Sequence, residues 1–263
     1  MTNTFQFIRY SIEHSIARVT FCRPEIHNAF NSAVIGEMGA AFTTISENPE
    51  IRVVVLTGEG KSFCAGADLN WMRSVRTQSF DENLAEANAL ADLFWAIYTC
   101  RCPVIARVNG AAIGGGTGFV AVCDVAISAE SAVFSFSEVK IGVVPACIGP
   151  YVIKKLGEGK ARELFLTGER INARRAVDVG LVNSVVVDSD LDDAVHKQVK
   201  QFLSSGPDAI ATAKRLLSEV PGMSPEQFRP YTAEMIARLR QSDEGQEGMD
   251  AFLNKRKPRW VQD

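Results

Sequence analysis

Two segments of small residues have the chemistry to stabilise a negatively charged oxygen. Residues 108–118 contain a run of three glycines, and residues 63–69 are similarly rich in small side chains. Each lies just after an apolar run of β type. Small residues allow a ligand to approach backbone N–H groups. Two such groups aimed at one point form an oxyanion hole, whereas either segment alone is more often a tight turn.

Glu138 is the candidate for proton transfer. Most of its neighbours in residues 134–141 are apolar or small. Burial among apolar groups raises the pKa of a carboxyl, which can then exchange protons near neutral pH. The competing interpretation is an exposed carboxylate at the end of a strand.

Length and composition describe a globular chain with a large core. The chain has 263 residues, of which 46% are hydrophobic, and a formal net charge of -3. This favours one large domain, or one domain with a small appendage. The charge gives no case for nucleic acid as a partner. Six cysteines without metal-ligand spacing are expected to be reduced thiols. With no basic and apolar leader at residues 1–5 and no apolar run long enough for a membrane span, we expect a cytoplasmic protein without a membrane partner.

Strand and helix patterns alternate along most of the chain and then become almost wholly helical from residue 191. The alternation favours an α/β fold. Asn31 and Ser32 are expected to cap a helix that buries one face. We expect residues 78–83 to form a loop because they are mostly polar. The other predicted elements are a hairpin of residues 5–11 and 16–21, strands at 51–56, 104–108, 124–128 and 132–136, a helix around 90–97, and a helix from about 117.

Several motifs occur in the order found in one family. They are Ala65-Gly66-Ala67-Asp68, the segment from Asn109-Gly110 to Gly116, Cys123-Asp124 before a β-type run, residues 136–145, residues 166–168 with 176–182, and residues 244–257. The chain resembles the crotonase superfamily, the enoyl-CoA hydratase/isomerase fold, over essentially its whole length. Within it, residues 66–72, 137–141, 145–151 and 231–240 are most similar to the bacterial methylglutaconyl-CoA hydratases.

The resemblance implies a spiral of ββα turns in residues 1–200 and a helical oligomerisation region in residues 201–263. It also implies a homotrimer or a dimer of trimers. The substrate would be an acyl-CoA thioester, so that coenzyme A belongs to the substrate and no separate cofactor is expected.

The resemblance also implies site residues. The backbone N–H groups of Ala67 and Gly115 would hold the thioester oxygen, Glu138 would be the acid/base, and a side chain at Gly115 is expected to block the thioester. Asp68 could equally cap a helix. The residues expected to bind the CoA ester are Ile26, Ala29, Ala65, Asp68, Leu69, Asn70, Phe252 and Lys255, the last two often supplied by a neighbouring subunit.

One position departs from the pattern of well-known hydratases, which carry a second Glu where this chain has Gly118. Either Glu138 alone activates water, or the protein is a Δ3,Δ2-enoyl-CoA isomerase, which needs a single base. A non-catalytic acyl-CoA-binding protein is the third alternative. A substrate with a distal carboxylate would need a cation in the acyl pocket, for which Arg73 and Lys140 are the candidates.

Overall fold

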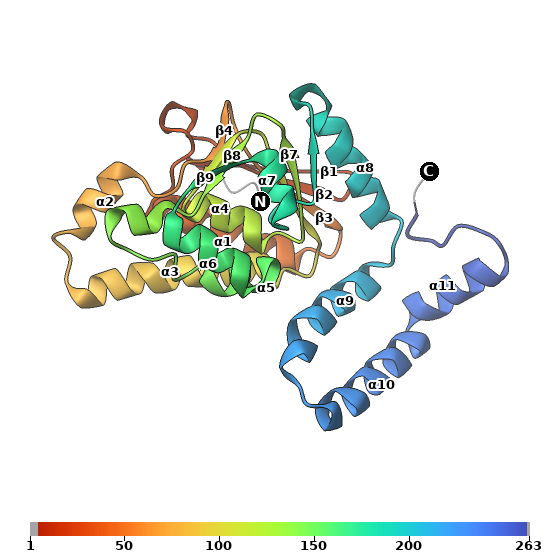
Figure 1. The fold of residues 1–263 in the computed structure, drawn as a ribbon. Helices are drawn as coiled ribbons and strands as arrows, with labels where there is room; N and C mark the ends of the chain where they lie inside the picture. The colour runs from red at the N-terminus through yellow and green to blue at the C-terminus, as the bar shows by residue number, and fades with distance from the viewer. Residues whose placement is uncertain (1–4, 262–263) are drawn as a thin grey trace.

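The computed structural model describes residues 5–261 as two sheets surrounded by helices (Figure 1). Residues 1–4, on which the prediction of no leader partly rests, lie outside the described residues. The larger sheet has the strand order β1 (Ile8–Glu13), β2 (Ile16–Phe21), β3 (Val53–Gly58), β5 (Val104–Val108), β7 (Val125–Ala129) and β10 (Ser184–Val186). The smaller has the order β4 (Ser62–Cys64), β6 (Ala111–Ile113), β8 (Val133–Ser135) and β9 (Arg170–Asn172).

Successive turns of the chain add one strand to each sheet. The pairs β3 and β4, β5 and β6, and β7 and β8 each run from the larger sheet to the smaller one before the next helix. Pairing is parallel except between β1 and β2 and between β8 and β9. This arrangement confirms the α/β fold and the predicted spiral of ββα turns.

Helices cover both sheets and form the C-terminal region. They are α1 (Ser32–Glu47), α2 (Leu69–Val75), α3 (Phe80–Tyr98), α4 (Gly115–Val122), α5 (Gly149–Leu156), α6 (Glu158–Thr167), α7 (Ala173–Asp178), α8 (Leu191–Leu203), α9 (Pro207–Glu219), α10 (Pro225–Gln241) and α11 (Asp243–Leu253). Short 3₁₀ helices are η1 (Pro24–Ile26), η2 (Ser137–Ile141), η3 (Asp188–Asp190) and η4 (Val220–Gly222). No helix in residues 5–261 is long and apolar enough to cross a membrane.

The helix starts show which local signals were sufficient. Asn31 caps α1 by accepting a hydrogen bond from the Val34 N–H, as predicted. The expected loop at residues 78–83 is wrong, because α3 begins at Phe80. Ser79 and Glu82 form a reciprocal capping box there, which satisfies the free N–H groups of an exposed first turn. Capping chemistry and not an apolar stripe therefore defines this helix start.

The core lies on both faces of the larger sheet. On one face, residues 116–122 of α4 are buried, and Phe119 packs against Phe21, Phe30 and Phe94. On the other face, α8 buries Val195 and Val199 against the sheet. Burying an aliphatic or aromatic side chain fully stabilises a fold by about 1.5–3 kcal/mol. The α4 helix, whose first residue is Gly115, is thus held rigidly inside the molecule.

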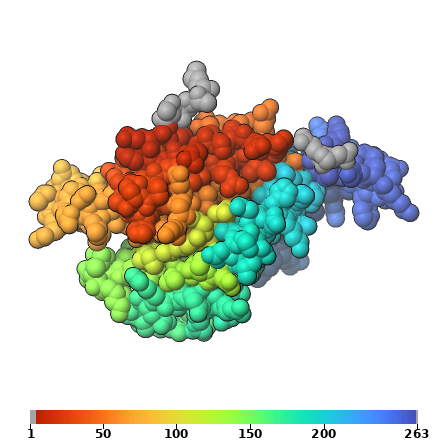
Figure 2. Space-filling view, turned by 90° about the horizontal axis from the view of Figure 1, so that it is seen from above, coloured from red at the N-terminus to blue at the C-terminus, as the bar shows by residue number. Residues whose placement is uncertain are grey.

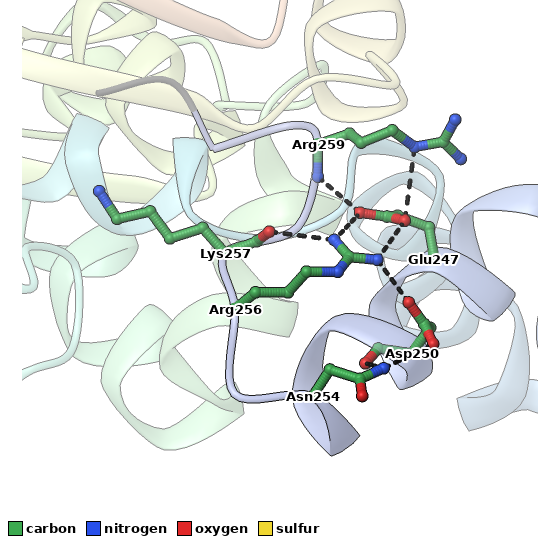
Figure 3. A network of polar contacts seen from close by, with 6 residues as sticks. All are labelled: Glu247, Asp250, Asn254, Arg256, Lys257 and Arg259. Carbon is green, nitrogen blue, oxygen red and sulfur yellow. Dashed lines mark hydrogen bonds and ion pairs between the residues drawn. The ribbon is translucent and has the colours of Figure 1, made fainter.

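The helices α9, α10 and α11 extend away from this body (Figures 1 and 2). In Figure 1 they lie on the opposite side of the molecule from α2. Since α8 continues to Leu203, it spans the predicted boundary at residue 200; the division itself stays a prediction. Past α11, the chain is tied back by Arg256, which donates to both carboxylate oxygens of Glu247 at 2.7 and 2.9 Å and to Asp250 at 2.6 Å (Figure 3).

Candidate active site

Hydrogen bonds on either side of Ala67 fix its backbone. The Phe30 N–H donates to the Gly66 carbonyl oxygen, and the Asp68 N–H donates to the Phe30 carbonyl oxygen, both at 2.8 Å. In this parallel bridge the Ala67 N–H points away from Phe30. Within residues 5–261 that N–H has no acceptor. Gly66 has φ +91°, a conformation that favours glycine. The Ala67 N–H is therefore a rigidly held donor, free for a ligand.

Gly115 provides the second donor. It is the first residue of α4, so its N–H has no acceptor within the helix and lies at the positive end of the helix dipole. A Cβ built on Gly66 would lie 4.0 Å from the Gly115 nitrogen. The two segments that the sequence separates by almost fifty residues are thus brought side by side, as an oxyanion hole requires.

Glu138 lies in the first turn of η2, beside this pair. Its Oε1 would be 3.2 Å from a Cβ built on Gly114, the residue before Gly115. Its Oε2 is buried, and no group in residues 5–261 donates a hydrogen bond to it. Burial raises the pKa of Glu138, opposed in part by a hydrogen bond from its own backbone N–H. The alternative of an exposed carboxylate at a strand end is wrong, because the carboxyl lies against Gly114 with its Oε2 buried.

Asp68 has a structural role that follows from its contacts. It caps α2 by accepting from the Asn70 N–H at 2.7 Å and pairs with the Arg23 guanidinium at 2.8 Å. Burial would raise the pKa of Asp68, but the hydrogen bonds from Asn70 and Arg23 outweigh it and lower this pKa. Arg23 also donates to the Ala29 carbonyl oxygen at 2.7 Å. Arg23, which sequence reasoning missed, therefore joins the segment around Ala29 to the one that carries Ala67.

The packing around Gly115 gives a reason for a glycine at this position. A Cβ there would lie 2.7 and 2.8 Å from two ring atoms of Phe30. The expectation that a side chain here would also block the thioester stays a prediction. At Gly116, a Cβ would lie 2.0 Å from the Cys64 carbonyl oxygen. A side chain would therefore have to displace the Phe30 ring at position 115 or the Cys64 backbone at position 116.

The sequence matches a known family over most of its length. The family model described as enoyl-CoA hydratase/isomerase matches residues 11–263.

This chain belongs to the enoyl-CoA hydratase/isomerase family.

Relatives match it over nearly their whole length. A Thermus thermophilus protein, whose own assignment as an enoyl-CoA hydratase is provisional, is 34% identical over 93% of this chain and 97% of its own. The crystal structure of an enoyl-CoA hydratase from Shewanella pealeana is 38% identical, with a TM-score of 0.94 over 97% of this chain and 96% of its own. Pseudomonas aeruginosa AtuE is 32% identical, with a TM-score of 0.95 over 98% and 100%. These matches confirm the prediction that the chain belongs to the crotonase superfamily, whose members act on acyl-CoA thioesters.

Within this family member, the space beside Gly118 is occupied. A Cβ built there would lie 2.2 Å from Cγ2 of Ile148 and 3.3 Å from the Phe94 ring. Ile148 and Phe94 therefore form an apolar wall beside Gly118, the position at which the better-known hydratases carry a second Glu. The sequence showed the missing Glu, but it gave no sign that Ile148 fills the gap.

The predicted CoA-binding segments divide into two groups. Ile26 ends η1, and residues 26–29 lie beside residues 65–70, joined by a hydrogen bond of 3.0 Å from the Ala65 N–H to the His27 carbonyl oxygen. Leu69 is exposed at the start of α2. Phe252 and Lys255 are exposed at the end of α11, which lies across the molecule from α2. One chain therefore does not bring these two residues to its own Glu138.

The two candidate cations for a distal carboxylate occupy different surroundings. The exposed Arg73 donates to the Asn70 side-chain oxygen at 2.8 Å. The aliphatic part of Lys140 lies against Gly168, where a built Cβ would be 3.2 Å from its Cε. Arg73 thereby hydrogen-bonds Asn70, a residue predicted to bind the CoA ester.

Proposed function

We propose that this protein adds water across the α,β double bond of an enoyl-CoA. The observation that supports it best is the carboxyl of Glu138, whose buried Oε2 has no hydrogen-bond donor among residues 5–261. This carboxyl lies against Gly114, the residue before the backbone donor Gly115. A second free donor, the Ala67 N–H, lies in the adjoining segment. A base, an acid and an oxyanion site are thus available within one small region.

The reaction follows from these groups. Glu138 takes a proton from water as the water oxygen bonds to Cβ, and the double-bond electrons move through Cα to the thioester oxygen. The N–H groups of Ala67 and Gly115 stabilise the enolate, each by about 3–4 kcal/mol. The protonated Glu138 then delivers its proton to Cα and the thioester carbonyl re-forms. Burial raises the pKa of Glu138, so its carboxylate accepts a proton more readily than an ordinary carboxylate does, which suits the first half of this exchange.

We propose 3-methylglutaconyl-CoA, or a related branched enoyl-CoA, as the substrate, with Arg73 or Lys140 meeting a distal carboxylate. Phe252 and Lys255 are proposed to approach the nucleotide end of CoA in a neighbouring subunit of a trimer or a dimer of trimers. Their exposure at the far end of the chain supports this arrangement. CoA would enter as part of the substrate, with no separate cofactor.

The Δ3,Δ2-enoyl-CoA isomerase is the second candidate function. The apolar wall of Ile148 and Phe94 beside Gly118 favours it, since this side of the site offers no second carboxylate to hold water. Glu138 alone would move a proton between two carbons of the acyl chain, and the same oxyanion site would stabilise the dienolate.

The deciding experiment assays the purified protein side by side with 3-methylglutaconyl-CoA, crotonyl-CoA and a 3-enoyl-CoA. Selective hydration of the first supports the proposed function. Turnover of the 3-enoyl ester alone makes the protein an isomerase. If the protein converts none of the three esters but binds acyl-CoA, and Glu138→Gln binds it equally well, the protein is a non-catalytic acyl-CoA-binding protein.

A further inference from the structure

We propose that Phe30 is a positioning residue that sets the distance between the two backbone donors of the oxyanion site. The inference rests on the proposed function, because it takes the N–H groups of Ala67 and Gly115 as those donors. Phe30 touches neither the reacting atoms nor the CoA ester in this proposal. It acts through the two donor segments, both of which it contacts.

The backbone of Phe30 holds the first donor. It donates to the Gly66 carbonyl oxygen and accepts from the Asp68 N–H, each at 2.8 Å. These two bonds flank Ala67 and fix the direction of its free N–H. A shift of the Phe30 backbone would therefore move the Ala67 donor with it.

The side chain of Phe30 holds the second donor. The ring lies against the Cα of Gly115 so closely that a Cβ there would be 2.7 Å from Cζ and 2.8 Å from Cε1. The same ring meets Phe119, one turn further along α4, edge to face with centroids 5.5 Å apart. The first turn of α4 thus packs directly against the Phe30 ring.

The ring cannot easily give way. Phe30 is 2% exposed, and Trp71 of α2 packs against it with ring centroids 5.8 Å apart. Trp71 is itself anchored by a hydrogen bond of 2.7 Å from its Nε1 to Glu86 of α3. The helices α2 and α3 therefore hold the ring in place on the side that Trp71 covers. Because the ring is fixed, Phe30 fixes the positions of the two donors relative to each other.

The experiment compares Phe30→Leu, Gly115→Ala and the double variant, with crotonyl-CoA and the best ester from the three-substrate assay. Phe30→Leu removes ring atoms that contact Gly115. Gly115→Ala adds a methyl group that pushes the Gly115 N–H away from the Phe30 ring. A displacement near 1 Å at a reacting centre costs about 100-fold in rate. We expect each single variant to lower kcat by about 10- to 100-fold, with KM changed less than threefold, because the donors matter most in the transition state.

The double variant distinguishes positioning from general damage. A methyl group at Gly115 occupies the space that Phe30→Leu vacates, so we expect at least a tenfold recovery of kcat over the worse single variant. Phe42→Leu in α1 is the matched control, because Phe42 is also fully buried. It should lower the melting temperature comparably and leave kcat unchanged. Phe30→Met, which retains more volume, serves if Phe30→Leu fails to fold.

Three results would overturn the inference: wild-type kcat in Phe30→Leu, losses that multiply in the double variant, or an equal loss of kcat in Phe42→Leu. A wild-type protein without turnover of any enoyl-CoA contradicts the proposed function itself, so the two failures are distinguishable.

Discussion

Replacing Glu138 by Gln is expected to stabilise the fold while removing activity. The substitution keeps the size of the side chain and removes the charge from a carboxyl whose Oε2 is buried without a donor among residues 5–261. An unsatisfied buried polar group costs about 1–3 kcal/mol, and a charged one tends to the upper end. The amide of Gln is still polar and lacks the same partner, so only the extra cost of the charge is removed, and we expect the free energy of unfolding to rise by about 1 kcal/mol at neutral pH. For a chain of this size, that corresponds to about 2–4 °C in melting temperature per kcal/mol.

The gain should depend on pH in a defined direction. The folded-state pKa of Glu138 lies above its ordinary value of 4.5, because burial disfavours the charged form. The folded protein thus holds this proton more tightly than the unfolded chain, and wild-type stability falls as the pH rises through the folded pKa. The advantage of Glu138→Gln is therefore largest at neutral pH and shrinks as the pH approaches 4.5.

The assay is unfolding by urea or heat at pH 7.5 and at pH 5, beside kinetics on the same samples. The exposed Glu130 gives the matched control, since Glu130→Gln should alter neither stability nor kcat appreciably. Loss of general acid–base catalysis should lower kcat in Glu138→Gln by about 10²–10⁴-fold. A variant no more stable than wild type at pH 7.5, or an advantage independent of pH, would refute the placement of this carboxyl.

Three further outcomes follow from the structure and from the proposed binding of the CoA ester. Arg23→Gln leaves the Asp68 carboxylate buried without its cation, so urea titration should show a loss of about 3 kcal/mol, and an unchanged midpoint would contradict the pairing. Gly118→Glu alone should fail to raise crotonyl-CoA hydration because Ile148 fills the space, whereas adding Ile148→Ala should allow a gain over Ile148→Ala itself. A faster hydration by Gly118→Glu alone would show that Ile148 moves aside, which would contradict this expectation. Lys255→Ala should raise KM severalfold for a CoA ester but not for the matching pantetheine ester, which lacks the nucleotide. Equal effects on both esters would contradict the proposal that Lys255 binds the nucleotide end.

What could be predicted from the sequence is local or carried by motifs. The helix at Asn31 was predictable because its cap and its buried face lie within sixteen residues. Glu138 and the small-residue segments were found because their neighbours and spacing indicate the chemistry. The start of α3 was missed because an exposed polar turn has no apolar periodicity, although Ser79 and Glu82 carry the capping signal.

The contacts that support the site could not be read in this way. Arg23 meets Asp68 across 45 positions, and nothing near either residue indicates the partner. Phe30 and Ile148 look like ordinary core residues until the fold sets them against Gly115 and Gly118. Supports of this kind join segments that are distant in the chain, so their roles depend on the spiral that assembles them.

The proposed mechanism has Glu138 carry the proton to Cα while the backbone donors hold the thioester oxygen. It is tested most directly by running the reaction in D₂O with the best hydration substrate and locating carbon-bound deuterium in the product by NMR. We predict one deuterium at Cα, in a single configuration, from the wild-type protein, and no product above background from Glu138→Gln. Formation of the same deuterated product by Glu138→Gln at the wild-type rate would contradict the claim.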